Sequence, residues 1–314
     1  MSALIRTLFL WLSRRRRAGD WLESVPPANR LLRRFVAGHN HDEAIETAQA
    51  LVERGFRVTF SLLGEDVAAP TDANAAADEY RTLLERIAKA GLASESKIAV
   101  KPSLLGLSLN YETALGNLLS VLEAARWVSV AVELDMERSD STDNTLALFR
   151  AGVRETPTLG VAIQAYLRRS GGDVQALIDQ RIAHVRLVKG AYSEPAELTY
   201  SSPARIEKSF HDLARVLLDA KSIEGGASLG VATHDMRLIA EARTRAFRKQ
   251  TPADRWEVQM LYGVKPSQQQ ALLDQGYAVR VYLPYGPHWY PYFLRRIAER
   301  PGNLWFALRS VFSR

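Results

Sequence analysis

The chain has 314 residues, of which 47% are hydrophobic and 24% are charged, and it contains no cysteine. This composition is typical of a globular protein and excludes a disordered or fibrous chain. The lack of cysteine excludes disulfides, thiolate nucleophiles and Cys-ligated metals. Barrels of roughly 250 residues form one compact unit, so we expect a single domain with an appendage.

The net charge of +6 is confined to the N-terminal arm. Residues 1–36 contain eight arginines against Asp20 and Glu23, whereas the remainder holds 33 basic and 33 acidic residues. A nucleic-acid enzyme would carry its basic surplus on the folded domain that reads the duplex. We therefore expect no nucleic-acid partner.

The arm begins with an apolar run, SALIRTLFLWL, and continues with four arginines at 14–17. Arg6 interrupts the run, which is also shorter than the about 20 apolar residues that span a bilayer. A signal peptide would place its basic residues before the apolar run. Two interpretations stay open: a helix packed on the domain with solvated arginines, or an interfacial anchor on anionic lipid.

After a helical stretch over 28–54, apolar runs rich in Val, Ile and Leu predict eight strands. We expect them at 57–65, 96–105, 128–137, 158–166, 183–192, 227–235, 256–263 and 277–286. Helices are expected at 74–91, 111–127, 141–152, 172–182, 204–221, 235–248, 265–275, 287–300 and 302–313. Neither half carries a Gly-x-Gly-x-x-Gly turn, which favours a closed barrel over a doubly wound sheet. The predicted fold is an α/β protein with a (β/α)8 TIM-like barrel over 56–314, preceded by an N-terminal helical arm over 1–55 that packs on it.

Polar side chains lie near the ends of six of the eight expected strands, although inward positions of a barrel are mostly Val, Ile and Leu. They are Lys101, Asp135, Gln164, Arg186, Lys189, Thr233, His234 and Tyr282. Singly, each has an ordinary explanation: Lys101 as a solvated lysine, Asp135 as a helix N-terminal acid, His234 as part of a helix cap. Together they indicate an active site at the carboxyl-terminal face of the barrel.

The segment over 287–300 has a polar face beside several aromatic residues. At helical spacing one face carries Tyr292, Arg295, Arg296 and Glu299. An exposed stripe of ion pairs would explain the charges, but Trp289 and its aromatic neighbours make a poor solvent face. Paired guanidiniums beside aromatic rings suit a planar carboxylate.

Four strings resemble those of the proline dehydrogenase family, including the proline dehydrogenase domain of proline utilization A. They are VRLVKGAY (185–192), ATHD (232–235), VQMLYG (258–263) and VYLPYG (281–286), the last followed by YFLRRIAER (292–300). The resemblance runs from the first strand to residue 303, and the length is similar to that of the monofunctional bacterial enzymes. It implies noncovalent FAD and oxidation of L-proline to 1-pyrroline-5-carboxylate by hydride transfer to the flavin. This is the first step of proline catabolism to glutamate, and the electrons are expected to pass to a quinone.

The resemblance also implies roles for individual residues. The substrate would be bound by Glu65, Lys101, Asp135, Leu261, Tyr282, Tyr292, Arg295 and Arg296. Within this set Lys101, Arg295 and Arg296 would hold the carboxylate, and Glu65 would pair with Arg295 as a gate. FAD would be bound by Gln164, Arg186, Val188, Lys189, Gly190, Ala191, Thr233, His234, Arg296 and Glu299. The resemblance gives catalytic roles to Lys101 and Arg186, with Arg186 near the isoalloxazine, and no metal is expected.

Two positions depart from the family pattern. Ser61 stands in FSLLGE where many relatives are expected to have an acid, which puts support from the first strand in question. Ser193 follows GAY where the long bifunctional enzymes carry Trp, so contacts to the flavin are expected to differ in detail.

Three other classes of protein would account for some of these residues. A barrel aldolase would use Lys101 or Lys189 as a Schiff-base amine, which needs a desolvated lysine. A metal hydrolase would use residues far apart in sequence, namely His39, His41, Asp42 and His234. A non-catalytic membrane-associated protein would leave the polar strand ends unexplained. We expect a cytoplasmic protein, which would be peripheral on the inner face of the membrane if the arm binds lipid.

Overall fold

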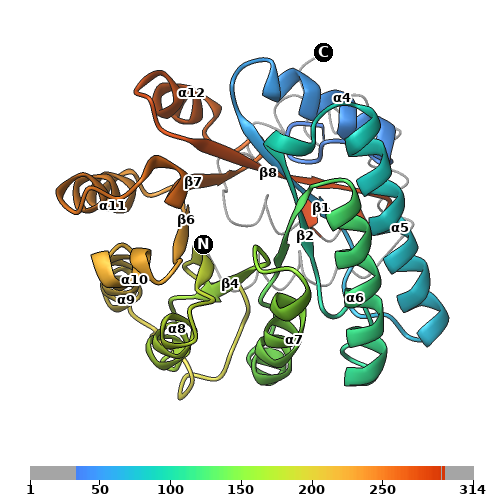
Figure 1. Cartoon of the computed structure of the whole chain (residues 1–314), viewed down its shortest axis with the longest axis horizontal. Helices are drawn as coiled ribbons and strands as arrows, with labels where there is room; N and C mark the ends of the chain where they lie inside the picture. Colours follow the sequence, from blue (N-terminus) through green and yellow to red (C-terminus); the bar gives the residue numbers. More distant parts are fainter. Residues whose placement is uncertain (1–32, 291, 294–314) are drawn as a thin grey trace, which may run out of the picture.

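Eight parallel strands close into a barrel with helices around its outside (Figure 1). The computed structural model describes residues 33–290, 292 and 293. Neighbouring strands follow the chain order, and β1 closes the ring by pairing with β8. The strands are β1 (Arg57–Leu62), β2 (Ser96–Val100), β3 (Ala131–Leu134), β4 (Gly160–Gln164), β5 (His184–Val188), β6 (Ser228–Ala232), β7 (Trp256–Leu261) and β8 (Val279–Tyr285). The predicted (β/α)8 barrel is confirmed.

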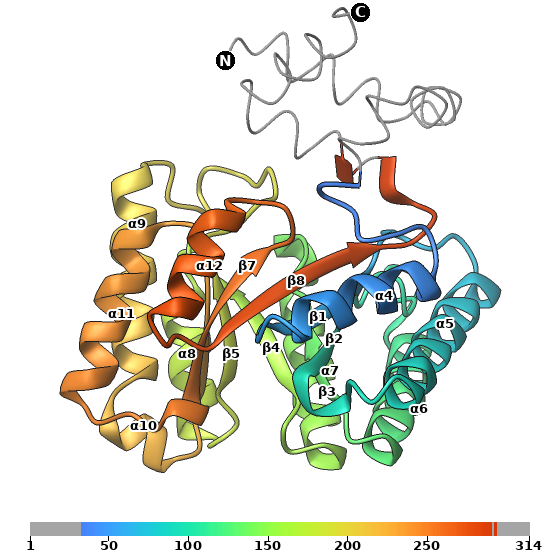
Figure 2. The same ribbon diagram turned by 90° about the horizontal axis from the view of Figure 1, so that it is seen from above.

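The helices from α5 onward lie between successive strands, and α4 precedes β1. Figure 2 shows α9 and α11 on one side of the barrel and α5 and α6 on the other. The α-helices are α4 (His41–Val52), α5 (Pro70–Lys89), α6 (Tyr111–Trp127), α7 (Thr142–Glu155), α8 (Ser170–Asp179), α9 (Pro203–Leu217), α10 (Ala220–Glu224), α11 (Met236–Arg248) and α12 (Pro266–Asp274). Short 3-10 helices are η1 (Ala93–Glu95), η2 (Ser139–Ser141) and η3 (Ala253–Arg255). Within the described part of the chain, no helix is both long and apolar enough to cross a membrane.

The starts of these helices follow from local sequence. Proline occupies the first turn of α5, α9 and α12, where its missing N–H costs no hydrogen bond. Asn110 caps α6 by accepting a hydrogen bond from the Thr113 N–H at 2.8 Å. Asp235 caps α11 by accepting from the Arg237 N–H at 3.1 Å. These caps satisfy N–H groups that a helix leaves without partners, and they fix where each loop above the barrel ends.

Alternation along each strand separates an apolar outer face from a polar inner face. In β2, Ile98 and Val100 are fully buried and belong to the apolar core between the strands and the helices. The intervening Lys97 faces the barrel interior, where it contacts Glu133 of β3 and Glu257 of β7. Because side chains alternate with a period of two, Lys101 points to the same side as Lys97.

The strands are shorter than predicted, and two predicted helices differ. The strand expected over 96–105 ends at Val100 because turns begin at Pro102. The helix expected over 28–54 is wrong for residues 33–40, since Asn40 caps α4 by accepting from the Glu43 N–H. The helix expected over 204–221 is divided in two, because Asp219 caps α10. Most of the helix expected at 287–300, all of that at 302–313 and the arm up to residue 32 lie outside the described residues.

Candidate active site

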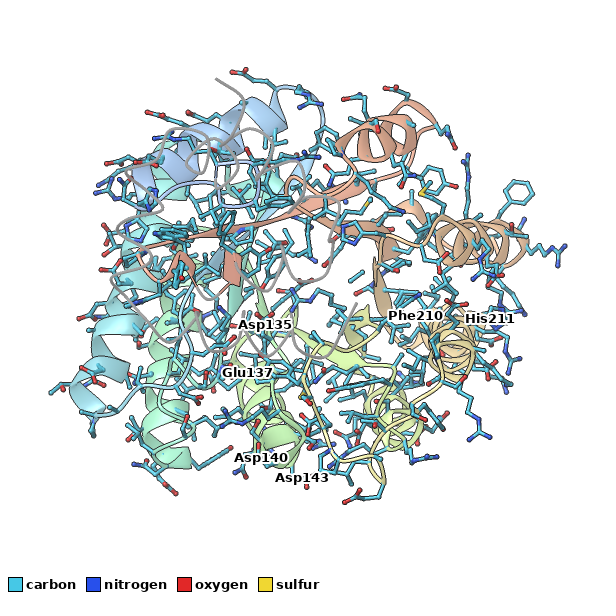
Figure 3. The ribbon with its side chains drawn as sticks, turned by 180° about the vertical axis from the view of Figure 1, so that it is seen from behind. Asp135, Glu137, Asp140, Asp143, Phe210 and His211 are labelled. Atoms are coloured by element: carbon cyan, nitrogen blue, oxygen red, sulfur yellow. The ribbon has the colours of Figure 1, made fainter. Side chains whose placement is uncertain are left out.

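The carboxyl ends of all eight strands border one large cavity of about 1860 Å³. Residues at or just after the last position of each strand line it: Leu62, Lys101, Asp135, Gln164, Val188, Ala232, Leu261 and Tyr285. In Figure 3, Asp135 lies near the middle of the ring, whereas Asp140 and Asp143 lie farther out toward α7. Asp135 is therefore a residue of the barrel mouth and not a helix N-terminal acid.

The structure brings most of the expected site residues into this cavity. Those that line it are Glu65, Lys101, Asp135, Gln164, Arg186, Val188, Lys189, Gly190, Ala191, His234, Leu261, Tyr282 and Tyr292. Thr233 lies instead in a smaller adjoining cavity of about 580 Å³, which shares Lys189, Ala232 and His234 with the large one. Arg295, Arg296 and Glu299 lie outside the described residues, so the expected pair of Glu65 with Arg295 does as well.

Arg186 is held in a buried cluster at the centre of the cavity wall. Its Nη2 atom donates to Asp135 Oδ1, and the Tyr282 hydroxyl donates to Asp135 Oδ2 at 2.7 Å. The guanidinium carbon lies 4.9 Å from the centre of the Tyr282 ring, a cation–π distance. Asp135 thus joins a cation and a phenol that come from two strands that are not neighbours, β5 and β8.

Burial and charge set the protonation state of this cluster. Burial alone would lower the pKa of Arg186, but Asp135 and its other neighbours raise it above the ordinary value, so the guanidinium stays charged. Burial, together with the charge of Asp135, raises the pKa of Tyr282 well above its ordinary value, against a hydrogen bond with Ser61. The phenol therefore stays protonated and donates. Ser61 supports Tyr282 at the position where the family pattern led us to expect an acid.

Lys101 lies at the mouth of the barrel with 8% of its surface exposed. Its ammonium group donates to the Leu62 carbonyl at 2.7 Å, and its backbone N–H donates to the Tyr80 hydroxyl at 3.2 Å. The first contact fixes the side chain beside the end of β1, and the second fixes the backbone just after β2. An ammonium group in this position places a positive charge at the cavity wall.

Gln164 and Glu137 link the ends of β3 and β4. The Gln164 amide donates to the Glu137 carbonyl at 2.7 Å. The Glu137 carboxylate accepts from the Ser103 N–H at 2.8 Å and from the Ser103 hydroxyl at 2.6 Å. Burial raises the pKa of Glu137 to about 6, although both hydrogen bonds from Ser103 oppose the rise. Glu137 is the last residue of the strand expected over 128–137 and was not among the site residues expected from the sequence.

The loop after β5 brings backbone close to the cavity. Gly190 has a φ of +115°, and a Cβ there would lie 2.2 Å from Cδ1 of Tyr166. Only glycine avoids both the strain and the overlap. The neighbouring Lys189 forms ion pairs with Asp235 at 3.1 Å and Glu207 at 3.4 Å. Ser193, farther along the loop, is exposed.

An aromatic cluster stands beside the cavity after β8. Trp289 makes edge-to-face contacts with Tyr290 and Phe293, at centroid distances of 5.7 and 5.8 Å. Phe293 is almost fully buried, and Tyr292 packs against this cluster and lines the cavity. From Trp289 onward, the described part of the segment over 287–300 is therefore aromatic and largely buried, whereas Arg295, Arg296 and Glu299 of the predicted polar face lie outside the described residues.

The histidines proposed for a metal site have other partners. His234 Nε2 accepts from the Leu261 N–H at 3.1 Å, which ties the end of β6 to β7. His41 lies 3.2 Å from Glu79, and burial lowers the pKa of His41 despite that carboxylate. Among the residues described, no group of three or more His, Asp or Glu side chains is placed to hold a metal ion.

The sequence matches the family model described as proline dehydrogenase over residues 44–307. It is 36% identical over 312 residues to proline dehydrogenase 1 of Bacillus subtilis (strain 168), an alignment that covers 99% of this chain and 100% of that protein. It is also 36% identical over 286 residues to the proline dehydrogenase of Deinococcus radiodurans, covering 90% of each.

Longer proteins match over part of their length. The chain is 28% identical over 327 residues to the bifunctional protein PutA of Escherichia coli (strain K12), covering 24% of it. A crystal structure of proline utilization A from Bdellovibrio bacteriovorus, inactivated by N-propargylglycine, aligns with a TM-score of 0.79 at 25% identity. That alignment covers 87% of this chain and 33% of the solved one. On the family match and the two relatives aligned over nine tenths or more of their length, the chain belongs to the proline dehydrogenase family.

Proposed function

We propose that this protein is an FAD-dependent L-proline dehydrogenase that produces 1-pyrroline-5-carboxylate, as the first step of proline catabolism to glutamate, and passes the electrons to a quinone. The observation that carries the proposal is the buried cluster of Arg186, Asp135 and Tyr282 at the mouth of the barrel. It presents a fixed cation beside a large cavity, in a chain that belongs to the proline dehydrogenase family.

The residues present fit FAD on several grounds. The large cavity has room for a flavin and a small substrate, and Gly190 lets the backbone come close to a planar ring system. The adjoining cavity carries Lys189, Arg237 and Lys265 near the N-terminus of α11, which suits a diphosphate group. In this arrangement FAD would be held by Gln164, Arg186, Val188, Lys189, Gly190, Ala191, Thr233 and His234. When bound, FAD would supply the acceptor for the hydride that leaves the ring carbon next to the nitrogen of proline.

The chain's own residues would bind and orient the substrate. Lys101 provides a positive charge for the carboxylate, together with Arg295 and Arg296 from the segment outside the described residues. Leu261, Tyr282 and Tyr292 would pack on the pyrrolidine ring. Orientation of this kind lowers the barrier because the reacting atoms are already in place. Arg186 would stabilise negative charge that develops nearby.

The aldolase alternative receives less support from the geometry. A Schiff-base lysine must lose its proton, so it is usually desolvated or placed beside another cation. Lys189 is neither: its side chain is 34% exposed, and its Nζ atom forms ion pairs with the carboxylates of Asp235 and Glu207.

The proposal is tested on the purified protein by visible spectroscopy. We expect flavin bands that are bleached when L-proline is added without oxygen, and that respond poorly to hydroxyproline because Tyr282 would crowd the hydroxyl group. Bound flavin that stays oxidised with proline would contradict the substrate. A protein that cannot take up FAD would contradict the whole proposal.

The basic arm would have a role in this function. If the acceptor is a membrane quinone, an arm that lies on anionic lipid would bring the cavity close to it. We accordingly propose a cytoplasmic protein with peripheral membrane contact through residues 1–17.

A further inference from the structure

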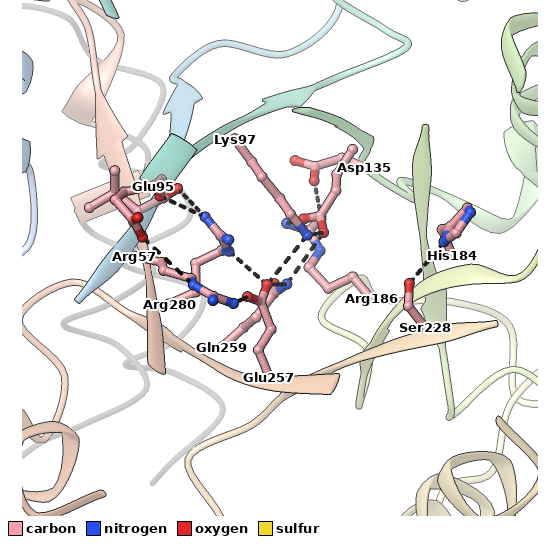
Figure 4. Close-up of polar contacts among 12 residues, drawn as sticks. Arg57, Glu95, Lys97, Asp135, His184, Arg186, Ser228, Glu257, Gln259 and Arg280 are labelled. Carbon is pink, nitrogen blue, oxygen red and sulfur yellow. Dashed lines mark hydrogen bonds and ion pairs between the residues drawn. The ribbon is translucent and has the colours of Figure 1, made fainter. Parts of the chain in front are cut away.

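The interior of the barrel below the cavity is charged, although most barrels fill this space with Val, Ile and Leu. Lys97 Nζ donates to Glu133 Oε1 at 2.8 Å and lies 3.3 Å from Glu257 Oε1. Arg280 Nε donates to Glu257 Oε1 at 2.6 Å, and the Gln259 amide contacts Glu257 at 2.9 Å and Glu133 at 3.3 Å. In Figure 4, Arg280, Glu257, Gln259 and Lys97 lie next to one another, and Arg186 and Asp135 lie beside them.

The charges of this group of side chains balance. The cations are Arg57, Lys97, Arg186 and Arg280, and the carboxylates that pair with them are Glu95, Glu133, Asp135 and Glu257. Buried charges are costly unless they are paired and hydrogen-bonded. Burial would raise the pKa of Glu133, but Lys97 and Arg186 hold it below its ordinary value, so this carboxylate stays ionised.

The barrel wall leaves room for this group of side chains. A Cβ on Gly160 of β4 would lie 2.9 Å from Glu133 Cγ. A Cβ on Gly230 of β6 would lie 2.5 Å from the Gln259 amide nitrogen. Any larger residue at either glycine would push the polar side chain out of place. The glycines of β4 and β6 therefore provide the space that the polar side chains of the barrel interior occupy.

Glu133 connects this group of side chains to the cavity. It lies two residues before Asp135 on β3 and so shares its inward face. Its Oε2 atom lies 3.9 Å from Arg186 Nη1, while Asp135 holds Nη2. Oε2 makes no hydrogen bond within the described residues, which leaves the guanidinium as the charge that it faces. Arg186 is thus held between two carboxylates and the Tyr282 ring.

We propose that Glu133 is a positioning residue, which holds the Arg186 guanidinium at the cavity wall from below and keeps it oriented for the reaction. The inference rests on the proposed function. Asp135 holds only Nη2 of the guanidinium, and the Tyr282 ring contacts its face; the carboxylate of Glu133 adds an attraction at Nη1 that opposes rotation in the plane of the guanidinium. Glu133 itself does not line the cavity.

The test compares Glu133→Gln with Glu257→Gln. Glu257 is the matched control because it has the same charge, similar burial and shared partners in Lys97 and Gln259, but no contact with Arg186. Both variants are expected to lower the denaturation midpoint. In anaerobic stopped-flow experiments, Glu133→Gln should slow flavin reduction at saturating proline by about tenfold or more, because small errors in positioning are costly. KM should change little, and Glu257→Gln should stay within about threefold of the wild type.

Equal slowing in both variants, or an unchanged rate in Glu133→Gln, would overturn the proposal. Should Glu133→Gln not fold, Glu133→Asp keeps the charge but draws the carboxylate back from Arg186. Flavin reduction in that variant is expected to be measurably slower than in the wild type, and wild-type rates in it would also overturn the proposal.

A measurement without FAD separates this inference from the proposed function. The change in denaturation midpoint caused by the double variant should differ from the sum of the changes caused by Glu133→Gln and Arg186→Gln, because the two side chains interact directly. The matching cycle with Glu257→Gln should be close to additive. If proline does not reduce the flavin of the wild type, the proposed function is wrong. The comparison of the single and double variants still tests whether Glu133 contacts Arg186. Additive midpoints in the Glu133 cycle would exclude the contact itself.

Discussion

Glu137 is a buried carboxyl group at the end of β3 whose pKa is raised to about 6. It accepts two hydrogen bonds from Ser103, and Gln164 donates to its backbone carbonyl. The raised pKa means that the folded state binds a proton more readily than the unfolded state does. Its contribution to stability is therefore fully present below about pH 4.5 and is lost as the pH rises through about 6.

This yields a prediction for stability against pH. The free energy of unfolding of the wild type should lose about 2 kcal/mol relative to Glu137→Gln between about pH 3.5 and pH 7.5, with most of the loss between about pH 4.5 and 6.5. Gln keeps the size of the side chain but does not titrate, so the difference between the two proteins isolates this group. Urea denaturation at several pH values measures it. A difference that does not vary with pH would show that Glu137 titrates normally.

At the scale of an element, the loop after β5 illustrates how backbone geometry shapes the site. The strand ends at Val188, and the chain turns at Gly190 with a positive φ against the Tyr166 ring. Burial, helped by the charge of Glu194, raises the pKa of Tyr166 to about 12, so this ring stays neutral beside the turn. The loop then reaches Glu194, which accepts a hydrogen bond from the Ser139 N–H at 2.9 Å.

Gly190→Ala is expected to disrupt this loop. The added methyl group meets the Tyr166 ring and the backbone is strained, at a cost of about 1–3 kcal/mol. FAD should be retained poorly after gel filtration, since the loop borders the cavity. Gly171→Ala is the control: it lies in α8, and a Cβ there meets nothing within 4 Å. That variant should be neutral or more stable by about 0.5–1 kcal/mol. Equal flavin content in both variants would contradict a role for the loop.

The strands themselves were predictable, and their ends less so. Apolar runs such as the one around Ile98 and Val100 predict a strand, because both faces of a strand in a parallel barrel are buried. The runs continue past the true ends because Lys101 and Pro102 precede further apolar residues in turns. A strand ends where its neighbour no longer forms backbone hydrogen bonds with it. The local sequence does not show that position, so the ends of the strands depend on the assembled sheet.

At the scale of the whole molecule, charge is divided between the arm and the domain. The surplus of six lies in residues 1–36, and the remainder is neutral. Polybasic segments next to apolar side chains bind anionic lipid, with about 1 kcal/mol for each Lys or Arg near the surface. This attraction weakens with salt.

Deletion of residues 1–17 is therefore expected to abolish sedimentation with vesicles that contain anionic lipid. It should leave flavin reduction by proline unchanged, because these residues precede the barrel. Replacing only the arginines at 14–17 with glutamine separates charge from apolar insertion and should remove most of the binding at low salt. Full vesicle binding by the deleted protein would assign the arm to packing on the domain instead.

The sequence alone determined the class of fold and the family, and it predicted which face of the barrel carries the candidate site. Hydrophobic runs at regular spacing predict the strands and helices. The same runs show roughly where the strands end, and so place polar residues such as Lys101 and Gln164 at those ends. Only the tertiary structure decided which of those side chains meet. Asp135 reaches Arg186 and Tyr282, and Glu133 reaches Lys97 and Gln259, because closure of the barrel brings separate strands to one axis. Alternation within a strand tells which face a residue takes, but the partner across the interior is set by the register and tilt of all eight strands together.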